Sequence, residues 1–252
     1  MELIVIGAGP AYTDRRGAAA ASYLVRADGA ALLLDLGQGS FANLAATLDP
    51  SELAAVLVSH LHPDHFIDLV PLRHYLRFEF DPPRRVRVLG PAGLEDRLDA
   101  LHALPGFAAA GLDVARLAAM QPIGPFAVMA LLVHHTEESY AFRVSVAAGS
   151  GAATGPGLVY SGDCSRADDL VPLIRPGDTL LAEASFGAGP VRSGAEHLTA
   201  ADAARAASAG RAARLLLTHI QMGYDRAEAL AAAQAAFSGP VQLVTEGDRF
   251  EV

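Results

Sequence analysis

The sequence of 252 residues predicts an α/β fold, a four-layer sandwich in which two mixed β-sheets pack face to face between outer helices. Strand-like and helical segments alternate along the chain, and they do so in two similar halves, about residues 1–122 and 123–252. In each half, strands end in side chains of the kinds that bind metals, so we expect these side chains to meet at the shared edge of the sheets. No long linker separates the halves, which predicts one domain over residues 1–252.

The first half supplies one set of strands and helices. Short apolar runs predict strands near Leu3–Ile6, Ala21–Arg26, Ala31–Asp35, Ala54–Ser59 and Val86–Leu89. Segments between and after them predict helices near Phe41–Leu48, Leu69–Phe78 and Gly93–Ala103.

The second half repeats the pattern after Pro105-Gly106. Strands are predicted near Phe126–His134, Ala141–Val146, Gly157–Ser161, Thr179–Glu183 and Arg214–Thr218, and a last strand begins at Val241. Helices are predicted over an Ala-rich segment from Thr199 to about Ala209 and over about Asp225–Phe237. The small residues of Gly149–Gly157 predict a hairpin loop.

Composition indicates a globular protein, since 52% of the residues are apolar. No apolar stretch reaches the ~18 residues that a membrane helix needs, and the first residues show no basic leader, so we expect a cytoplasmic protein without a membrane partner. The single cysteine, Cys164, excludes an internal disulfide and fits a reducing compartment. We interpret it as a small buried residue.

The formal net charge of −9 argues against a sequence-independent grip on long nucleic acid, and no DNA partner is expected. All basic residues are Arg. Their local concentration between Arg73 and Arg87 is interpreted as a solvated face beside a Pro-rich loop.

The segment Gly7-Ala8-Gly9-Pro10 follows a strand and superficially matches a dinucleotide-binding fingerprint. The third glycine of that fingerprint is missing, and Pro10 with the residues after it would not open a helix. We therefore reject NAD binding.

The most informative motif is His60-Leu61-His62-Pro63-Asp64-His65, which follows a strand. Pro63 cannot continue the ladder of backbone hydrogen bonds, so the motif is expected in a loop at the strand's C-terminal end. His60 and His62 are two residues apart in an extended segment, so they point to the same side and can share one ion. Asp64 and His65, past the turn, can face a second ion.

Three further sites complete a metal shell. Asp163 and His219 each stand at a strand end, and so does the pair His134-His135. Neighbouring residues on a strand face opposite ways, so one of these two histidines can point into the site. Together with the motif they make seven ligands for two ions, with room for solvent on each ion.

At these positions the chain resembles the metallo-β-lactamase superfamily over nearly its whole length. Seven residues match the superfamily's metal signature: His60, His62, Asp64, His65, His135, Asp163 and His219. The residues after His135 resemble the same stretch of the phosphodiesterase branches, which selects His135 over His134. Asp35 matches an early aspartate that supports the site without binding metal. The resemblance implies the metallo-β-lactamase fold.

The second half is similar to the RNase Z-related phosphodiesterases. The segment around Glu183 and the run Glu196-His197-Leu198-Thr199 resemble their sequences. Two departures are visible: no insertion corresponds to the arm with which RNase Z grips tRNA, and Gln221-Met222-Gly223-Tyr224 replaces the usual Ser-x-Arg-Tyr. The arm-less form is more similar to small bacterial proteins described as atypical class II cyclic-nucleotide phosphodiesterases.

On this resemblance we expect two divalent ions, zinc first, with manganese or iron as alternatives because nitrogen and oxygen ligands accommodate all three. The expected ligands are His60, His62 and His135 for the first ion, Asp64, His65 and His219 for the second, and Asp163 between them. A hydroxide held between the ions would attack phosphorus.

Three other residues receive hypothetical roles. His197 lies just before a predicted helix, where it could give the leaving alkoxide its proton. His197 is therefore a candidate catalytic residue, and so is the expected ligand Asp64. A capping-loop histidine is the alternative for His197. Asp68 and Glu183 are candidates to orient ligand imidazoles, and an ordinary helix N-terminal acid is the alternative for Asp68.

The predicted function is a phosphodiesterase acting on a small phosphodiester, such as a cyclic nucleotide. Two alternatives stay open. One is an RNase Z-like RNA 3′-end endonuclease, with RNA as the partner. In a dimer, the Arg residues of both subunits could then bind the RNA in place of the missing arm. The other is hydrolysis of a carbon ester, lactone or thioester at the same metals. The resemblance also implies a homodimer.

Overall fold

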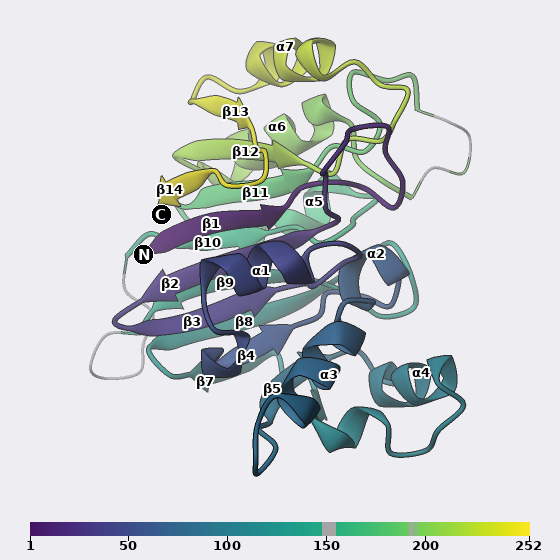
Figure 1. Cartoon of the computed structure of the whole chain (residues 1–252). Coiled ribbons are helices and arrows are strands. Elements are labelled where there is room, and N and C mark those ends of the chain that lie inside the picture. Colours follow the sequence, from purple (N-terminus) through teal and green to yellow (C-terminus); the bar gives the residue numbers. More distant parts are fainter. Residues whose placement is uncertain (148–154, 192–193, 195) are drawn as a thin grey trace.

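The computed structural model describes residues 1–147, 155–191, 194 and 196–252. Within them, two mixed sheets pack face to face and helices cover both outer faces (Figure 1). The predicted four-layer α/β sandwich is confirmed. The hairpin loop predicted over Gly149–Gly157 falls largely on residues 149–154, which lie outside the described residues.

In the described part of the chain, the first sheet has seven strands in the order β14-β1-β2-β3-β4-β5-β6. Neighbours from β14 to β3 run antiparallel, whereas β3 to β6 run parallel. The strands are β1 (Glu2–Gly7), β2 (Ser22–Ala27), β3 (Ala30–Leu34), β4 (Ala55–Leu57), β5 (Val86–Gly90), β6 (Leu112–Arg116) and β14 (Arg249–Glu251).

The second sheet likewise has seven strands among the described residues, in the order β13-β12-β11-β10-β9-β8-β7. Here β7 to β10 run antiparallel and β10 to β13 parallel. The strands are β7 (Met120–Ile123), β8 (Phe126–Val133), β9 (Ser139–Val146), β10 (Leu158–Tyr160), β11 (Thr179–Glu183), β12 (Arg214–Thr218) and β13 (Val241–Leu243). Each sheet therefore joins an antiparallel part to a parallel part, and ligands of such sheets bind at the carboxyl ends of the parallel strands.

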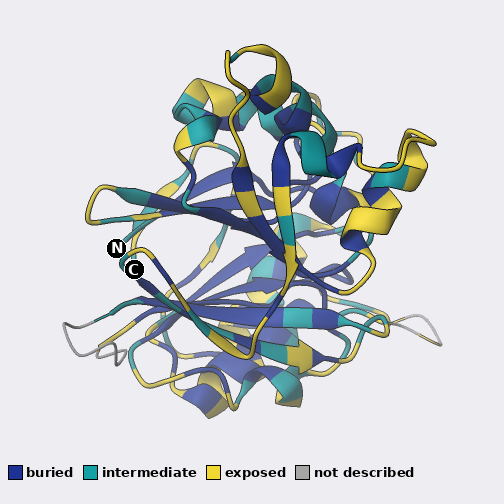
Figure 2. Ribbon diagram, turned by 90° about the horizontal axis from the view of Figure 1, so that it is seen from below, coloured by how far each residue is buried: buried dark blue, intermediate teal, exposed yellow. Residues whose placement is uncertain are grey.

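The helices lie on the outer faces of the sheets, where apolar side chains of both layers meet. Figure 2 shows the buried strands in the middle and exposed residues on the outer helices and loops. None of the helices in the described ranges is long and apolar enough to cross a membrane. The helices are α1 (Phe41–Thr47), η1 (Pro50–Glu52), α2 (Pro63–Phe66), α3 (Leu69–Phe78), α4 (Leu94–Leu101), η2 (Ala108–Ala110), α5 (Ala167–Leu170), α6 (Ala200–Gly210) and α7 (Arg226–Ala236).

Helix α6 begins at a capping box. The Thr199 hydroxyl accepts a hydrogen bond from the Asp202 backbone N–H at 3.1 Å, and the Asp202 carboxylate accepts one from the Thr199 N–H at 3.0 Å. Such a box satisfies two N–H groups that the helix leaves free. The cap fixes the backbone two residues after His197, which limits where that side chain can lie.

A buried ion pair joins β9 to the start of β11. The Arg143 guanidinium donates to both oxygens of Asp178, from Nε and from Nη2, each at 2.8 Å. The same carboxylate accepts from the backbone N–H groups of Gly157 at 2.7 Å and Arg175 at 2.8 Å. Both charged side chains are almost fully buried, and these four hydrogen bonds compensate the carboxylate for its lost solvation.

Three strands, two short α-helices and the three-residue helices η1 and η2 escape the sequence prediction. β6, β7 and β14 are short outer strands with largely exposed side chains, so they lack the apolar runs by which a strand is recognised. β14 also pairs beside β1 in the first sheet, across the whole length of the chain. Helices α2 and α5 have only four residues each, too few to show a helical period.

Candidate metal centre

The parallel strands of both sheets end at one edge of the sandwich, and the predicted site residues follow them. Asp35 comes directly after β3 and His219 directly after β12, while Asp163 lies three residues past β10. Asp35 and His219 have φ angles of 59° and 60°, in the left-handed region that side chains other than glycine rarely adopt. The chain thus turns sharply at both strand ends.

The His-rich motif is divided by the start of α2. His60 and His62 precede the helix, and Asp64 and His65 lie in its single turn. The His65 carbonyl accepts a hydrogen bond from Leu36 N–H at 2.8 Å, and a Cβ at Gly37 would lie only 1.9 Å from the Asp64 carbonyl oxygen. Glycine therefore lets the segment after β3 press against α2. The sharp turn predicted between the two halves of the motif is present, but the loop expected for the second half is wrong, because Pro63 begins α2 there.

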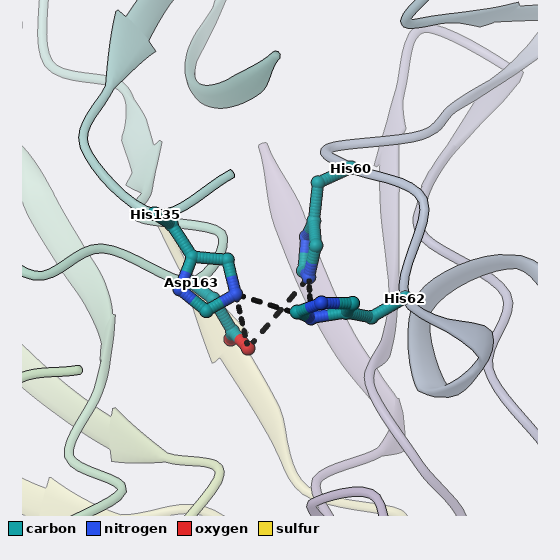
Figure 3. Close-up of side chains that lie close together, drawn as sticks. All are labelled: His60, His62, His135 and Asp163. Carbon is teal, nitrogen blue, oxygen red and sulfur yellow. Dashed lines mark hydrogen bonds and ion pairs between the residues drawn. The ribbon is translucent and has the colours of Figure 1, made fainter. Parts of the chain in front are cut away.

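The first cluster consists of His60, His62, His135 and Asp163 (Figure 3). His62 Nδ1 lies 3.0 Å from His60 Nε2 and 3.1 Å from His135 Nε2. Asp163 Oδ2 lies 3.8 Å from His60 Nε2 and 3.7 Å from His135 Nε2. Three imidazole nitrogens and one carboxylate oxygen thus converge on one point, although they come from both sheets.

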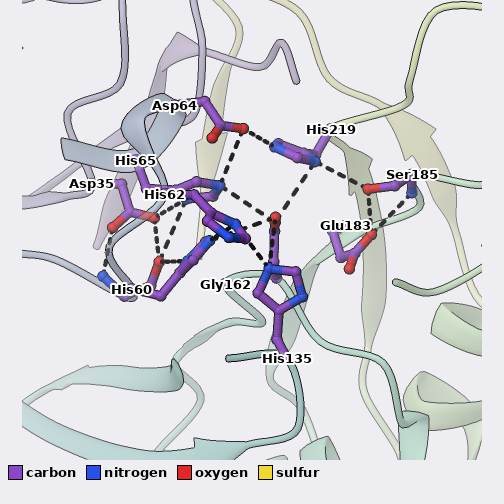
Figure 4. A network of polar contacts seen from close by, with 12 residues as sticks. Asp35, His60, His62, Asp64, His65, His135, Gly162, Glu183, Ser185 and His219 are labelled. Carbon is purple, nitrogen blue, oxygen red and sulfur yellow. Dashed lines mark hydrogen bonds and ion pairs between the residues drawn. The ribbon is translucent and has the colours of Figure 1, made fainter. Parts of the chain in front are cut away.

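The second cluster consists of Asp64, His65, Asp163 and His219. Figure 4 labels Asp64, His65 and His219 of this cluster. Asp64 Oδ2 lies 3.2 Å from His219 Nε2 and 3.7 Å from His65 Nε2. Asp163 Oδ1 lies 3.4 Å from His65 Nε2. Asp163 belongs to both clusters, with Oδ2 toward the first and Oδ1 toward the second.

Two buried atoms of the second cluster fit a cation. His65 Nε2 and Asp163 Oδ1 have no hydrogen-bond partner among the described residues, a costly state for buried polar atoms. Burial alone would raise the pKa of Asp163, but the imidazoles of His219 and His65 hold that pKa well below its usual range. Metal ligation needs an ionised carboxylate and neutral imidazoles, so a bound cation would take the place of the protons that His65 and His219 otherwise hold beside Asp163. The clusters are therefore able to bind metal ions.

Asp35 supports His65 from behind. Its Oδ2 lies 2.7 Å from His65 Nδ1 and accepts hydrogen bonds from the Ser59 hydroxyl at 2.7 Å and the Tyr160 hydroxyl at 2.6 Å. Its Oδ1 accepts from the Ser59 N–H at 2.7 Å. A proton on Nδ1 that is donated to Asp35 leaves Nε2, which faces Asp163, as the nitrogen that could bind a cation.

Glu183 and His197 form a second supporting group. Glu183 Oε1 lies 3.0 Å from His197 Nδ1, and Glu183 Oε2 accepts from the Ser185 hydroxyl, which lies 3.0 Å from His219 Nδ1. Burial opposes a charge on His197, but the carboxylates of Glu183 and Asp163 outweigh it and raise the pKa of His197 to about 9. Glu183 thus holds two imidazoles, one of them through Ser185.

The remaining predicted residues lie elsewhere. His134 is turned away from the clusters and lies 2.7 Å from Asp169 through Nδ1. The Asp68 carboxylate accepts from the Phe41 backbone N–H at 2.8 Å, at the start of α1, and in the described ranges it contacts no imidazole of the two clusters. Cys164 is fully buried, and burial raises the pKa of its thiol to about 12.

Ser59, Tyr160 and Ser185 also belong to the site, although no motif in the sequence predicts them. Their hydroxyls bond to the carboxylates that orient His65 and His219. Each is close in sequence to a predicted residue, but a hydroxyl beside a motif is too common to be recognised. Only the packing of the two sheets brings Tyr160 to Asp35, which lies 125 positions earlier in the chain.

Both clusters open into one cavity of about 250 Å³. Among the described residues it is lined by five of the side chains discussed above and by a second group from the loops around them. The first group is His62, Asp64, Asp163, His197 and His219; the second is Pro10, Ala11, Tyr12, Pro63 and Gln221.

Two stacked mixed sheets, with His/Asp clusters able to bind metal ions at their shared edge, define a metallo-hydrolase of the metallo-β-lactamase fold. The chain belongs to the β-lactamase superfamily, because residues 32–220 match the family described as "Beta-lactamase superfamily domain". The resemblance stated from the sequence is confirmed.

Three relatives illustrate its place in the superfamily. ML1173 of Mycobacterium leprae is 35% identical over 92% of this chain and 82% of its own length. The probable metallo-hydrolase YhfI of Bacillus subtilis is 27% identical over 91% of each chain. A ribonuclease Z of Metallosphaera sedula is 27% identical over 98% of this chain and 97% of its own. The crystal structure of YhfI has the same fold, with a TM-score of 0.86 at 24% identity, covering 100% of this chain and 99% of that one.

Proposed function

We propose that this protein is a metal-dependent phosphodiesterase that hydrolyses a small nucleotide diester, a cyclic nucleotide in the first place. The observation that supports it is the position of Asp163, whose two carboxylate oxygens face two different clusters of ligand-type nitrogens. Two adjacent cation sites that share one carboxylate suit the hydrolysis of phosphodiesters, in which negative charge grows on several oxygens at once.

The proposed ligands are the seven residues of the two clusters, and zinc is the proposed metal, since imidazole and carboxylate ligands suit it. When bound, the ions would polarise the phosphate and supply a nucleophile at neutral pH. Asp35 and Glu183 would keep the ligand imidazoles oriented through His65 and Ser185. Outer contacts of this kind contribute about 10–100-fold to metal affinity or activity.

His197 is the proposed proton donor to the leaving alkoxide. Its Nδ1 is engaged by Glu183, and its Nε2 has no hydrogen-bond partner among the described residues. The side chain lines the cavity and is only partly buried, with 17% of its surface exposed. A histidine held at one nitrogen by a carboxylate and free at the other can give a proton to a bound oxygen.

The test of the function is the release of AMP from 3′,5′-cyclic AMP by the metal-loaded protein. We expect turnover that a chelator abolishes and that added zinc or manganese restores. A chelator-treated and re-metallated sample serves as the control for damage by the treatment. Failure of the metallated protein to release AMP, with bound metal verified by elemental analysis, would overturn the proposal for cyclic nucleotides.

Replacing His197 by alanine is expected to lower kcat on cyclic AMP by about 10²–10⁴-fold, because general acid catalysis contributes about that much. Hydrolysis of bis(p-nitrophenyl) phosphate should change little, since nitrophenolate leaves without a proton. His134→Ala is the matched control, because His134 precedes ligand His135 but faces Asp169. Equal losses on both substrates would mean that His197 acts by holding Glu183 rather than by giving a proton.

A second candidate is cleavage of RNA near its 3′ end, which one observation favours. The ribonuclease Z of Metallosphaera sedula is similar over 98% of this chain, so the resemblance is not confined to the metal residues. If a precursor tRNA is cut while cyclic AMP is not, the RNA assignment replaces the first proposal.

A further inference from the structure

The loop between β1 and β2 begins with the glycine segment that does not serve as a dinucleotide fingerprint. No helix follows it within residues 8–21. Gly9 N–H donates to the Ala19 carbonyl at 2.7 Å, so the two ends of the loop lie side by side. A Cβ at Gly7 would lie 1.9 Å from the Ala20 carbonyl oxygen, and one at Gly9 would lie 2.9 Å from that of Ala19. The glycines therefore allow the base of the loop to close tightly.

The loop between β1 and β2 places Tyr12 beside the two His/Asp clusters. The Ala11 carbonyl, one residue before Tyr12, accepts a hydrogen bond from Gln38 Nε2 at 2.8 Å, which fixes the backbone there. Figure 1 shows the loop after β1, in purple, extending past the end of its strand. Tyr12 lines the same cavity as His62 and His219.

The Tyr12 side chain has no structural partner in the described part of the chain. It makes no hydrogen bond and no ring contact there, and 58% of its surface is exposed. An exposed aromatic ring is unremarkable by itself. Its position distinguishes it, because the other phenylalanines and tyrosines of the described residues do not line this cavity.

The size of the cavity decides which part of a ligand can reach Tyr12. At about 250 Å³ it falls below the roughly 300–1,000 Å³ of pockets that enclose a whole small molecule. A nucleotide with its phosphodiester at the clusters would therefore extend beyond this cavity, and the exposed ring of Tyr12 is one surface that the extending part could contact. A nucleobase is flat and stacks on an aromatic face regardless of its identity.

We propose that Tyr12 is the stacking platform for the base of the nucleotide ligand, while the phosphate lies at the His/Asp clusters. The inference rests on the proposed function only in taking the ligand to be a nucleotide. Gln221, which lines the same cavity, carries amide donors and an acceptor that suit the ribose or the base edge. Tyr12 then sets the preference for nucleotides over other phosphate esters and plays no part in bond cleavage.

The experiment compares the binding of AMP and of ribose 5-phosphate, which lacks the base, to the metal-loaded protein by calorimetry. We expect the wild type to bind AMP about 5- to 140-fold more tightly, the ratio that one stacked base provides. Tyr12→Ala should lose most of that ratio through weaker AMP binding, while Tyr12→Phe should keep it. Phe78→Ala is the control, because Phe78 is similarly exposed, at 65%, but lies outside the cavity.

The outcomes separate this inference from the proposed function. AMP binding that depends on Tyr12, without turnover of cyclic AMP, would support the stacking role and remove the phosphodiesterase assignment. If the protein turns over cyclic AMP and Tyr12→Ala keeps the wild-type ratio of AMP to ribose 5-phosphate affinity, the phosphodiesterase assignment is supported and the stacking role is wrong. A wild type that binds AMP and ribose 5-phosphate equally, or binds neither, overturns the inference whatever the activity.

Discussion

Replacing Asp163 by asparagine is expected to abolish activity and to deplete the protein of metal. The amide keeps the shape of the side chain but carries no charge, and one of its two terminal atoms donates rather than accepts. Both clusters would then lose their shared anionic ligand. Since loss of an outer contact alone costs about 10–100-fold, loss of a shared ligand should exceed about 10²-fold in turnover.

The measurement is metal content by elemental analysis after desalting, together with turnover and circular dichroism. Asp169→Asn is the matched control, because Asp169 contacts the neighbouring His134 and belongs to neither cluster. If Asp163→Asn is folded and retains wild-type metal content, the proposal of a carboxylate shared by two ions is wrong.

Replacing Asp178 by alanine is expected to destabilise the fold by about 3–5 kcal/mol. The change leaves the Arg143 guanidinium buried without its partner, which is far more costly than the net value of the pair itself. It also removes the acceptor for the Gly157 and Arg175 N–H groups. For a chain of this size the loss corresponds to a Tm lower by roughly 6–20 °C.

Thermal and urea unfolding of the metal-free protein would measure the loss of stability in Asp178→Ala. Asp113→Ala is the control, because Asp113 pairs with Arg85 at 2.7 Å on the surface, where such pairs contribute about 1 kcal/mol or less. The double variant Arg143→Met/Asp178→Leu should recover only part of the stability, since the two N–H groups stay unsatisfied. Equal stability of Asp178→Ala and Asp113→Ala would contradict the importance of burial.

Four of the proposed ligands, His60, His135, Asp163 and His219, could be placed because each follows the end of a strand by one to three residues. Parallel strands bring their carboxyl ends to one edge, so His60, Asp163 and His219 meet there although they are far apart in sequence. The sequence pattern alone left His134 and His135 undecided. The structure turns His134 toward Asp169 and His135 toward His62, a distinction that depends on local backbone geometry.

Other parts could not be predicted, for identifiable physical reasons. The edge strands β6, β7 and β14 are exposed, so their sequences carry no buried pattern. The contact between Tyr160 and Asp35 exists only because two sheets pack against each other. The role proposed for Tyr12 depends on the closure of a loop by Gly7 and Gly9, which gave a misleading motif in the sequence.

The left-handed backbone at Asp35 and His219 sets a limit on how this protein could evolve. A residue with a side chain costs about 1–2 kcal/mol there, whereas glycine would adopt the same φ freely. Glycine would relieve this strain, but at position 35 it would also remove the acceptor of the Ser59 and Tyr160 hydrogen bonds, and at position 219 a proposed ligand. These two turns therefore combine backbone strain with a side chain that the site needs, so variants there are constrained both by the backbone conformation and by the chemistry.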